Sequence, residues 1–359
     1  MLLNQLVDPY TKEDLKIISF DKIKSPVGIE NGILINENNF SAYPIINKAP
    51  ILLKNHIPEN FYHQYKALID PLFENSEIIN KQLLRKANSF SFSSEWEQFN
   101  KDNMSKTWGF TAEERLVQFF EETKTSPDEI RQKLILDAGS GNGLLTKAIA
   151  EKGAYAIGID YSDSVFNISL ANPNPNLLYI KGDLNHPPFK DETFDIIISN
   201  GVIHHTKSTK KTFAKVAALV KEGGKFYLWL YRRPYDLYMK AFIYSTDFLR
   251  FIVNKLPGSL QKVIVNLYAG FFYHLKRIRK KNVMEFDQLR IDAYDTLTPE
   301  YKHYHNPIEV AKWFHENGFE SPLLSHWDNP YGFGLMSIKN PKEQTPGINF
   351  KLRSGNKPF

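Results

Sequence analysis

Residues 134–143, LILDAGSGNG, limit the possible folds of this chain more than any other stretch. A short apolar run ends in Asp137, and three closely spaced glycines follow it at Gly139, Gly141 and Gly143. Glycine has no Cβ, so a turn made of glycines can be tight and a ligand can lie against its backbone. The helix-like run LLTKAIAEKG begins directly afterwards, and the free N–H groups at its start point toward the same place. We therefore expect a buried strand, a ligand-binding turn and a helix.

The same alternation continues up to residue 230, two last apolar runs at PLLSHWD and GFGLMSIKN complete the pattern, and together they predict an α/β fold. Short apolar runs such as YAIGID, LLYIKGD, FDIIISN and KFYLWLY alternate with amphipathic segments, which is typical of a parallel sheet covered by helices on both faces. Asp160 ends the second apolar run. Ligands bind at the carboxyl ends of the strands in such a sheet, and a carboxylate there can accept hydrogen bonds from both hydroxyls of a ribose. The loop and Asp160 together indicate a ligand that contains adenosine.

The spacing of the glycines argues against a dinucleotide. The dinucleotide fingerprint G-x-G-x-x-G would require glycine at position 144, which is Leu144. Further on, Gly182-Asp183 ends the third run, a proline-aromatic turn follows, and Phe194-Asp195 enters the fourth. With these motifs and the segment LVKEGGKFYLWLY, roughly residues 90 to 340 resemble the class I S-adenosylmethionine-dependent methyltransferases.

This resemblance implies a seven-stranded Rossmann-like sheet with the last strand antiparallel, and S-adenosyl-L-methionine as cofactor. It also implies which residues bind that cofactor. The matching positions are Asp137, Gly139, Ser140 and Gly141 for the methionine part, Asp160 and Tyr161 for the ribose and adenine, Asp183 and Leu184 for the adenine, Asn200 to His205 beside the methyl group, and Trp108 in an aromatic segment that closes the pocket.

Two pairs of histidines are candidates for a general base, because a hydroxyl acceptor gains from a base that titrates near neutral pH. His204 and His205 follow the fourth apolar run, and His303 and His305 alternate along an extended segment. The alternatives are that the first pair packs or hydrogen-bonds with backbone, and that the second lies in a solvated loop. No acidic residue near them shows ligand spacing, so we expect no metal site.

The other parts of the chain suggest a modular organisation. Residues 1–56 are β-rich and resemble the small zinc-ribbon proteins that activate RNA and protein methyltransferases, but the four cysteine positions of that family correspond to Asp8, Thr11, Asn36 and Asn39. The resemblance implies a stabilising module without zinc. Residues 57–130 are expected to form a helical cap over the cofactor pocket, residues 131–340 the methyltransferase domain, and residues 341–359 a tail.

An aromatic and basic insertion at 235–290 is the most individual part of the sequence. Its residues 235–282 predict two amphipathic helices separated by Pro257-Gly258, which we interpret as a lid over the acceptor site. A dimer surface, contact with a membrane surface, or contact between the basic end KRIRKK and RNA phosphates are alternatives.

Composition adds only broad limits. The chain has no cysteine, which excludes disulfides, a thiolate zinc site and a cysteine nucleophile. The first residues contain neither a signal peptide nor a run long enough to span a membrane, so a cytoplasmic location is expected. The sequence therefore predicts a methyltransferase that acts at oxygen on a small molecule, a glycan or a lipid precursor. The alternatives are a methyltransferase for RNA or protein and a non-catalytic S-adenosylmethionine-binding subunit. A net charge of only +5 does not lead us to expect a nucleic-acid partner. Peripheral membrane contact is an open alternative, and the sequence does not determine the oligomeric state.

Overall fold

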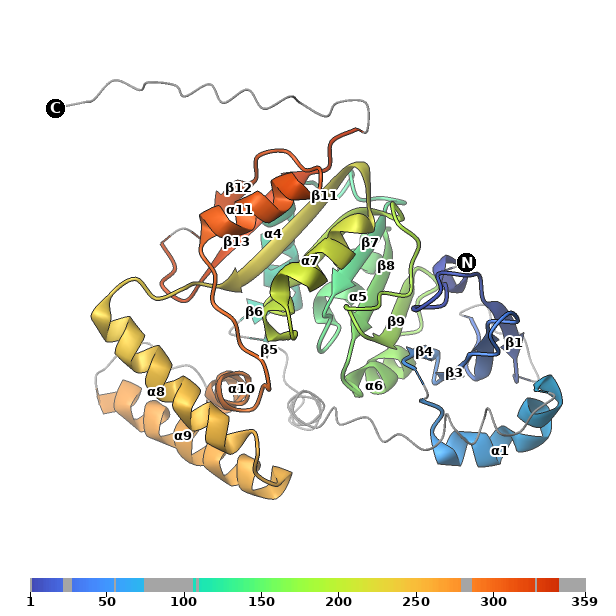
Figure 1. Cartoon of the computed structure of the whole chain (residues 1–359), viewed down its shortest axis with the longest axis horizontal. Helices are drawn as coiled ribbons and strands as arrows, with labels where there is room; N and C mark the ends of the chain where they lie inside the picture. The colour runs from blue at the N-terminus through green and yellow to red at the C-terminus, as the bar shows by residue number, and fades with distance from the viewer. Residues whose placement is uncertain are drawn as a thin grey trace.

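A single large sheet runs through the molecule (Figure 1). The computed structural model describes residues 2–21, 28–54, 56–73, 106–107, 110–278, 286–326 and 328–341. In these residues the sheet has eleven strands in the order β1-β2-β3-β4-β9-β8-β7-β10-β11-β13-β12, and a separate pair joins β5 (Lys106–Thr107) to β6 (Phe110–Thr111).

Seven of these strands form the predicted α/β sheet. They are β7 (Leu134–Ala138), β8 (Tyr155–Asp160), β9 (Leu177–Gly182), β10 (Phe194–Asn200), β11 (Val220–Tyr231), β12 (Leu323–Ser325) and β13 (Gly332–Ile338). Five neighbouring strands run parallel to one another, in the order β9-β8-β7-β10-β11. Strand β13 is antiparallel to both of its neighbours, β11 and β12. The prediction of a Rossmann-like methyltransferase sheet with its last strand antiparallel is confirmed.

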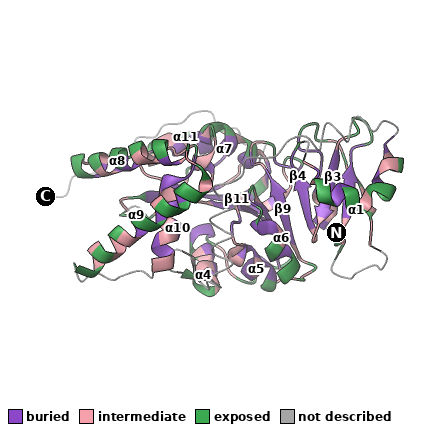
Figure 2. Ribbon diagram, turned by 90° about the horizontal axis from the view of Figure 1, so that it is seen from below, coloured by how far each residue is buried: buried purple, intermediate pink, exposed green. Residues whose placement is uncertain are grey.

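Helices cover both faces of this sheet, as Figure 2 shows. On one face lie α4 (Ala112–Thr123), α5 (Leu144–Glu151) and α6 (Ser164–Ala171), and on the other lie α7 (Thr209–Ala218) and α11 (Pro307–Glu316). The expected capping box at the start of α4 is present: Thr111 accepts from the backbone of Glu114, whose side chain accepts from the backbone of Thr111. The apolar face of each helix is buried against the sheet, with Phe119 on one side and Phe213 on the other.

The N-terminal strands extend the sheet at its β9 edge, which the sequence did not predict. They are β1 (Lys16–Ser19), β2 (Gly32–Ile35), β3 (Ala42–Ile46) and β4 (Ala49–Leu52), preceded by the short helix η1 (Leu2–Gln5). Strands β1 to β4 are antiparallel, and β4 pairs in parallel with β9, placing Ile51 beside Lys181. One face of these strands joins the core of the α/β sheet through residues such as Tyr43 and Leu52.

Helix α1 (Glu59–Ile69) and the short η2 (Asp70–Leu72) cover the other face of the N-terminal strands. Phe61 and Ile69 of α1 are buried in a cluster with Ile33 and Ile35 of β2. This part of the region 57–130 therefore packs on the N-terminal strands, whereas the sequence predicted that the whole region caps the cofactor pocket. The apolar residues of β2 that this helix covers are the physical reason for the difference.

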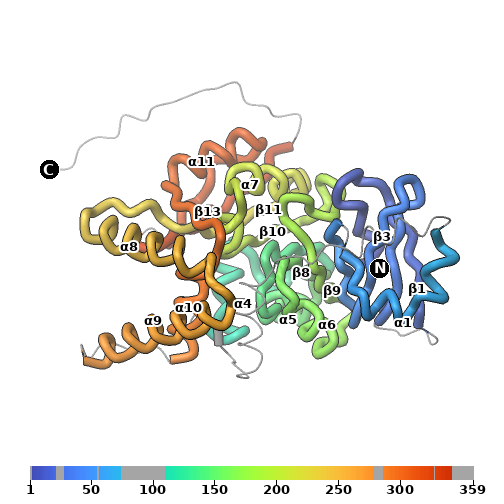
Figure 3. Tube along the Cα trace, turned by 60° about the horizontal axis from the view of Figure 1, so that its bottom comes forward, coloured from blue at the N-terminus to red at the C-terminus, as the bar shows by residue number. Residues whose placement is uncertain are grey.

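The insertion forms three helices beyond the end of the sheet (Figure 3). Helices α8 (Leu237–Val253) and α9 (Gly258–Ile278) diverge from the turn at Pro257, and α10 (Phe286–Leu297) packs against both. The buried contacts among the three helices include Val253, Val265 and Leu289. The two predicted helices exist, and both α8 and α10 contact the site described below: Tyr304 donates to Asp247 of α8, and Asp295 of α10 lies 3.1 Å from Nε2 of His205. That the α8–α9 hairpin forms a lid over the acceptor site stays a prediction. No helix in the described part of the chain has the length and apolar character needed to cross a bilayer.

Candidate cofactor and acceptor site

The glycine loop between β7 and α5 has a backbone that only glycine adopts readily. Gly139 has a φ of +98° and Gly143 a φ of +72°. The N–H of Gly139 donates to the carbonyl of Ile159 at 2.8 Å, which ties the loop to the end of β8. A Cβ at position 139 would lie 2.2 Å from Cγ2 of Val202, so the segment after β10 packs directly on this loop.

Asp160 lies at the end of β8 with its carboxylate held by two backbone donors. Oδ2 accepts from the N–H of Gly141 at 2.8 Å, and Oδ1 accepts from the N–H of Ser162 at 2.9 Å. Each carboxylate oxygen has two lone pairs, so each retains one for a further donor. The side chain is thus oriented before any ligand binds and fits the two hydroxyls of a ribose. Tyr161, beside it, is 39% exposed and is available to cover an adenine.

Asp137 and Ser140 are buried at the base of the loop. Burial raises the pKa of Asp137 to about 6, and its Oδ2 accepts from the hydroxyl of Thr146 at 2.6 Å. The side chain of Ser140 packs on Gly158, where an added Cβ would lie 2.8 Å from Cβ of Ser140. The sequence predicted cofactor contacts for both. The backbone of Ser140 is already engaged, because its N–H donates to the carbonyl of Ile159 at 3.1 Å and its carbonyl accepts from the N–H of Gly143 at 2.8 Å, while its buried hydroxyl has no hydrogen-bond partner among the described residues.

Asp183 follows β9, and its carboxylate is fixed by the next turn. Oδ1 accepts from the backbone N–H and the side-chain amide of Asn185, both at 2.8 Å, while Leu184 is buried beneath. The N-terminal module reaches this turn, because the ring of Tyr10 lies 4.9 Å from that of His186. The module therefore lies beside the loop expected to bind the adenine, a relationship that no motif in the sequence indicated.

The segment after β10 leads from the glycine loop to the histidines. Asn200 ends β10, where it is aligned with Trp229 of β11, and the short helix η3 (Ile203–His205) follows Val202. His204 is fully buried, and both of its ring nitrogens lack a hydrogen-bond partner among the described residues. Burial first, and then the neighbouring His205, lower its pKa well below the usual value, so the ring is neutral. It packs 4.1 Å from the ring of Tyr231.

His205 is anchored on both sides. Its Nδ1 lies 3.0 Å from the carbonyl of Tyr301, and its Nε2 lies 3.1 Å from Oδ1 of Asp295 on α10. Asp295 also accepts from the hydroxyl of Tyr231. Burial alone would raise the pKa of Asp295, but His205 and Lys302 lower this pKa to about 2. This buried contact joins η3 to α10.

His303 and His305 both lie against the start of α7. Nε2 of His303 is 3.1 Å from the carbonyl of Thr206, while His305 is held between Glu309, 3.2 Å from Nδ1, and the hydroxyl of Thr209, 3.0 Å from Nε2. The backbone N–H of His303 donates to the carbonyl of His204, so the two pairs form one cluster. An open pocket lined by both histidines and by Lys207, Ser208, Thr209, Lys210, Glu309 and Trp313 lies beside them.

Sequence reasoning missed Asp295 and Tyr231. Asp295 is far from His205 in the sequence, and no motif announces it. Trp108, predicted to close the pocket, lies outside the described residues. In the residues that the structure describes, no group of three or more acidic or histidine side chains could hold a metal ion.

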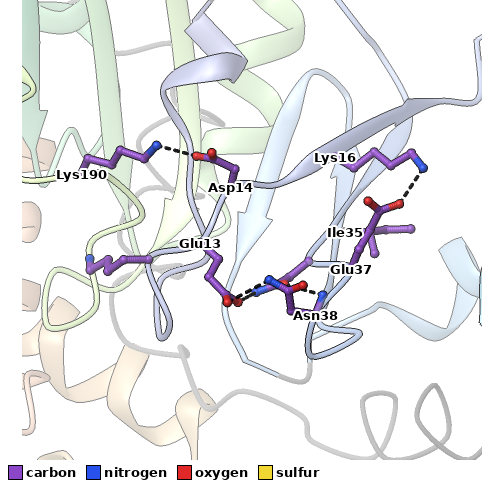
Figure 4. A pocket seen from close by; sticks show the side chains of 9 residues that line it. Glu13, Asp14, Lys16, Ile35, Glu37, Asn38 and Lys190 are labelled. Carbon is purple, nitrogen blue, oxygen red and sulfur yellow. Dashed lines mark hydrogen bonds and ion pairs between the residues drawn. The ribbon is translucent and has the colours of Figure 1, made fainter.

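The N-terminal module contains a second polar cluster, at the four positions that the alignment with zinc ribbons predicted. Oδ2 of Asp8 accepts from Asn36 at 3.1 Å and from Asn39 at 3.4 Å, and the amide of Asn36 also lies 3.1 Å from the hydroxyl of Thr11. Tyr43 donates to the same carboxylate. Hydrogen bonds thus join these four positions. Figure 4 shows the adjoining open pocket, where Glu13 interacts with Asn38 and Asp14 pairs with Lys190.

Comparison with known proteins identifies one family model and several relatives. Residues 136–228 match the family model described as a methyltransferase domain. A ubiquinone biosynthesis O-methyltransferase of Coxiella burnetii is 29% identical over 131 residues, which are 36% of this chain and 54% of that protein. One of Saccharophagus degradans is 28% identical over 181 residues, 48% of this chain and 72% of that protein. The chain spans about half the length of the first curated relatives that it matches.

Solved structures with a similar fold include the YcgJ protein of Bacillus subtilis, with 15% identity, a TM-score of 0.41, and coverage of 63% of this chain and 98% of that chain. Another is phosphoethanolamine N-methyltransferase 2 of Haemonchus contortus in complex with S-adenosyl-L-methionine. It has 14% identity and a TM-score of 0.43, and covers 71% of this chain and 58% of that one.

Proposed function

We propose that this chain, in which residues 136–228 form a class I S-adenosylmethionine-dependent methyltransferase domain, transfers a methyl group to a hydroxyl oxygen of a small molecule, a glycan or a lipid precursor. The preference for oxygen and for small acceptors rests on two curated relatives that are named as O-methyltransferases of ubiquinone biosynthesis. Bound S-adenosylmethionine would supply an activated methyl group on a sulfonium, so the protein's contribution is position and electrostatics.

The residues around the glycine loop fit that cofactor. The outward lone pairs of Asp160 suit the ribose hydroxyls, Tyr161 and Asp183 suit the adenine, and the backbone of Gly139 to Gly141 suits the methionine part. The preset carboxylate of Asp160 supports this assignment most directly, because its geometry is complete without the ligand. A carboxylate held in this way binds hydroxyl donors without a further cost in side-chain order.

The packing of Val202 on Gly139 is the observation that carries the acceptor side of the proposal. It fixes the segment after β10 against the cofactor loop, so η3 and the segment 301–305 that contacts it border the place where a methyl group would be presented. The contact between His205 and Asp295 holds these segments together and is a positioning element. Buried pairs of this kind lose their geometry when one partner is removed.

Among the four histidines, His303 is best suited to take the proton of the acceptor hydroxyl. Both ring nitrogens of His205 and of His305 face partners, and His204 is covered completely. His303 uses Nε2 as donor to the carbonyl of Thr206, which leaves the lone pair of Nδ1 as the acceptor. The oxygen would form its bond to the methyl carbon while the carbon–sulfur bond breaks, and the proton would pass to His303.

The acceptor and the base are tested in two steps. Cell extracts are incubated with the protein and a donor that carries a deuterated methyl group, and mass spectrometry identifies the labelled product. With that acceptor, His303→Gln is expected to lower the single-turnover rate about 10²–10⁴-fold while the affinity for S-adenosylmethionine is unchanged. His315→Gln, which changes an exposed histidine on α11, is the matched control.

The outcomes separate this proposal from its alternatives. A label on RNA or protein would replace the small-molecule assignment. Calorimetric binding of the cofactor with no labelled product in any extract would indicate a binding subunit. An unchanged rate in His303→Gln would refute the role of His303 and leave the cofactor site intact.

A further inference from the structure

Helices α8 and α9 carry apolar side chains on the face opposite the one they bury. On α8 these are Leu237, Tyr244, Phe248 and Phe251, and on α9 they are Leu260, Val263, Leu267, Phe271 and Ile278. Their spacing of three, four or seven residues places them on one side of each helix. Phe248 and Leu267 are each 69% exposed and Phe271 is 63% exposed. We call these two stripes together the outer face.

Packing among the residues that the structure describes does not explain the outer face. The opposite sides of α8 and α9 already supply Ile243, Val253, Val265 and Ala269 to contacts with the rest of the fold. Single exposed apolar residues are common on protein surfaces, but a continuous stripe of large ones on each of two adjoining helices usually marks a contact surface.

The charge of the hairpin indicates what the outer face contacts. Between residues 237 and 278 there are six basic residues, Lys240, Arg250, Lys255, Lys262, Lys276 and Arg277, and one acidic residue, Asp247. Asp247 is paired with Arg250 on the same helix at 3.4 Å. Lys255 and Lys262 are exposed on either side of the turn at Pro257, and Nζ of Lys255 lies 3.4 Å from the centre of the ring of Phe251.

We propose that the outer face docks on the surface of an anionic lipid bilayer. Aromatic and aliphatic side chains on one side of a helix, flanked by lysine, are the pattern of helices that lie in the interface plane. Each cation near an anionic membrane adds to the attraction. A second copy of the chain is disfavoured as the occupant, because two outer faces in contact would bring together like charges. The helices lie on the bilayer and do not cross it, in accord with the absence of a spanning helix in the described residues.

The docked orientation would bring the candidate acceptor site close to the membrane. Helix α10 packs against α8 and α9, and its Asp295 is paired with His205. The lipid-facing hairpin is thus joined through α10 to the segment that borders the acceptor site, and α8 also contacts that segment directly, because Asp247 accepts from Tyr304. This inference stands apart from the proposed chemistry, since it concerns a surface outside the cofactor site.

Co-sedimentation with lipid vesicles tests the proposal. The full chain is expected to bind vesicles of phosphatidylcholine mixed with phosphatidylglycerol at least tenfold more tightly than vesicles of phosphatidylcholine alone, and less tightly as salt is raised. The double variant Phe248→Ser/Phe271→Ser is expected to lose at least tenfold in binding. Leu68→Ser/Ile308→Ser, which changes two exposed apolar residues elsewhere (49% and 73% exposed), is expected to bind like the original chain.

A second pair of variants separates charge from apolar contact. Lys255→Glu/Lys262→Glu is expected to lose the preference for phosphatidylglycerol. Circular dichroism and calorimetry with S-adenosylmethionine show whether each variant is folded. If the folded chain does not bind vesicles, or if the aromatic variant binds as well as the original, the proposal is wrong. A dimer in sedimentation equilibrium that Phe248→Ser/Phe271→Ser dissociates would assign the outer face to a second copy and overturn it. Vesicle binding without cofactor binding would refute the proposed function alone.

Discussion

The side chain of Val202 fills the space in front of Gly139, so that a methyl group added at position 139 would lie 2.2 Å from Cγ2 of Val202. Two regions that are far apart in the sequence thereby fix each other: the turn expected to hold the cofactor and the segment that leads to the histidines. This contact makes the shape of the loop depend on the position of the segment after β10.

Gly139→Ala is therefore expected to abolish binding of S-adenosylmethionine and to lower the melting temperature. The substitution combines a strained positive φ, costing about 1–2 kcal/mol, with a clash that the neighbouring segment must relieve. Gly223→Ala is the matched control, because Gly223 also has a positive φ (+71°) but has nothing within 4 Å of the added Cβ. Similar melting temperatures for the two variants would show that Val202 does not restrict the loop.

Asp160→Asn is expected to weaken binding of S-adenosylmethionine by at least tenfold, which corresponds to about 1.4 kcal/mol. The amide loses one of the two carboxylate oxygens that are held by Gly141 and Ser162, and its NH₂ group cannot accept a hydroxyl. Isothermal titration calorimetry measures the effect. Glu151→Gln, which changes an exposed carboxylate paired with Lys147, should bind the cofactor normally.

Asp295→Asn is expected to destabilise the protein at neutral pH by about 3–5 kcal/mol, because it leaves His205 in a buried site without its charged partner. The pKa of Asp295 in the folded chain, about 2, is below the ordinary value of 3.8. Its contribution is therefore present above pH 4 and is lost as the pH falls toward 2. Urea unfolding at several pH values tests this, with Asp287→Asn on the exposed side of α10 as control. Equal losses in the two variants would contradict it.

Asp292→Asn should stabilise the protein above pH 7, whereas Asp295→Asn should destabilise it. Burial first, and then the nearby Asp295, raise the pKa of Asp292 to about 7. A carboxyl whose folded pKa is raised binds a proton that the unfolded chain releases, so the original protein should lose stability as the pH rises from about 4 to 7. The amide cannot ionise, and the variant is expected to have the higher melting temperature above pH 7. Differential scanning calorimetry against pH would refute this if the two curves stayed parallel.

Asp8→Ala is expected to destabilise the N-terminal module by roughly 2–4 kcal/mol, because its carboxylate accepts from the backbone of Tyr10 and Thr11 and from the side chains of Asn36, Asn39 and Tyr43. The backbone and side-chain donors oppose the effect of burial and lower the pKa of Asp8. Asp14→Ala, which removes only the exposed pair with Lys190, is the control and should change the stability little. A loss of comparable size in the control would contradict the role of the cluster.

Much of the fold follows from local patterns in the sequence. The apolar runs with glycine turns predicted the strands from Leu134 to Tyr231, and the three- and four-residue spacings predicted α4, α8 and α9. Because Asp160 and Asp183 stand at the ends of predicted parallel strands, the sequence placed both at the carboxyl end of the sheet. These features could be predicted because each depends on a few neighbouring residues whose backbone preferences agree.

Only the tertiary structure decided which distant residues meet. The pairing of β4 with β9, the packing of α1 on β2, and the contact of Asp295 with His205 join segments that share no periodicity or motif. The tertiary structure also decided that the outer face of α8 and α9 stays exposed. A sequence pattern shows that a helix has an apolar side, whereas which side becomes buried depends on the shapes and charges of the elements that reach it.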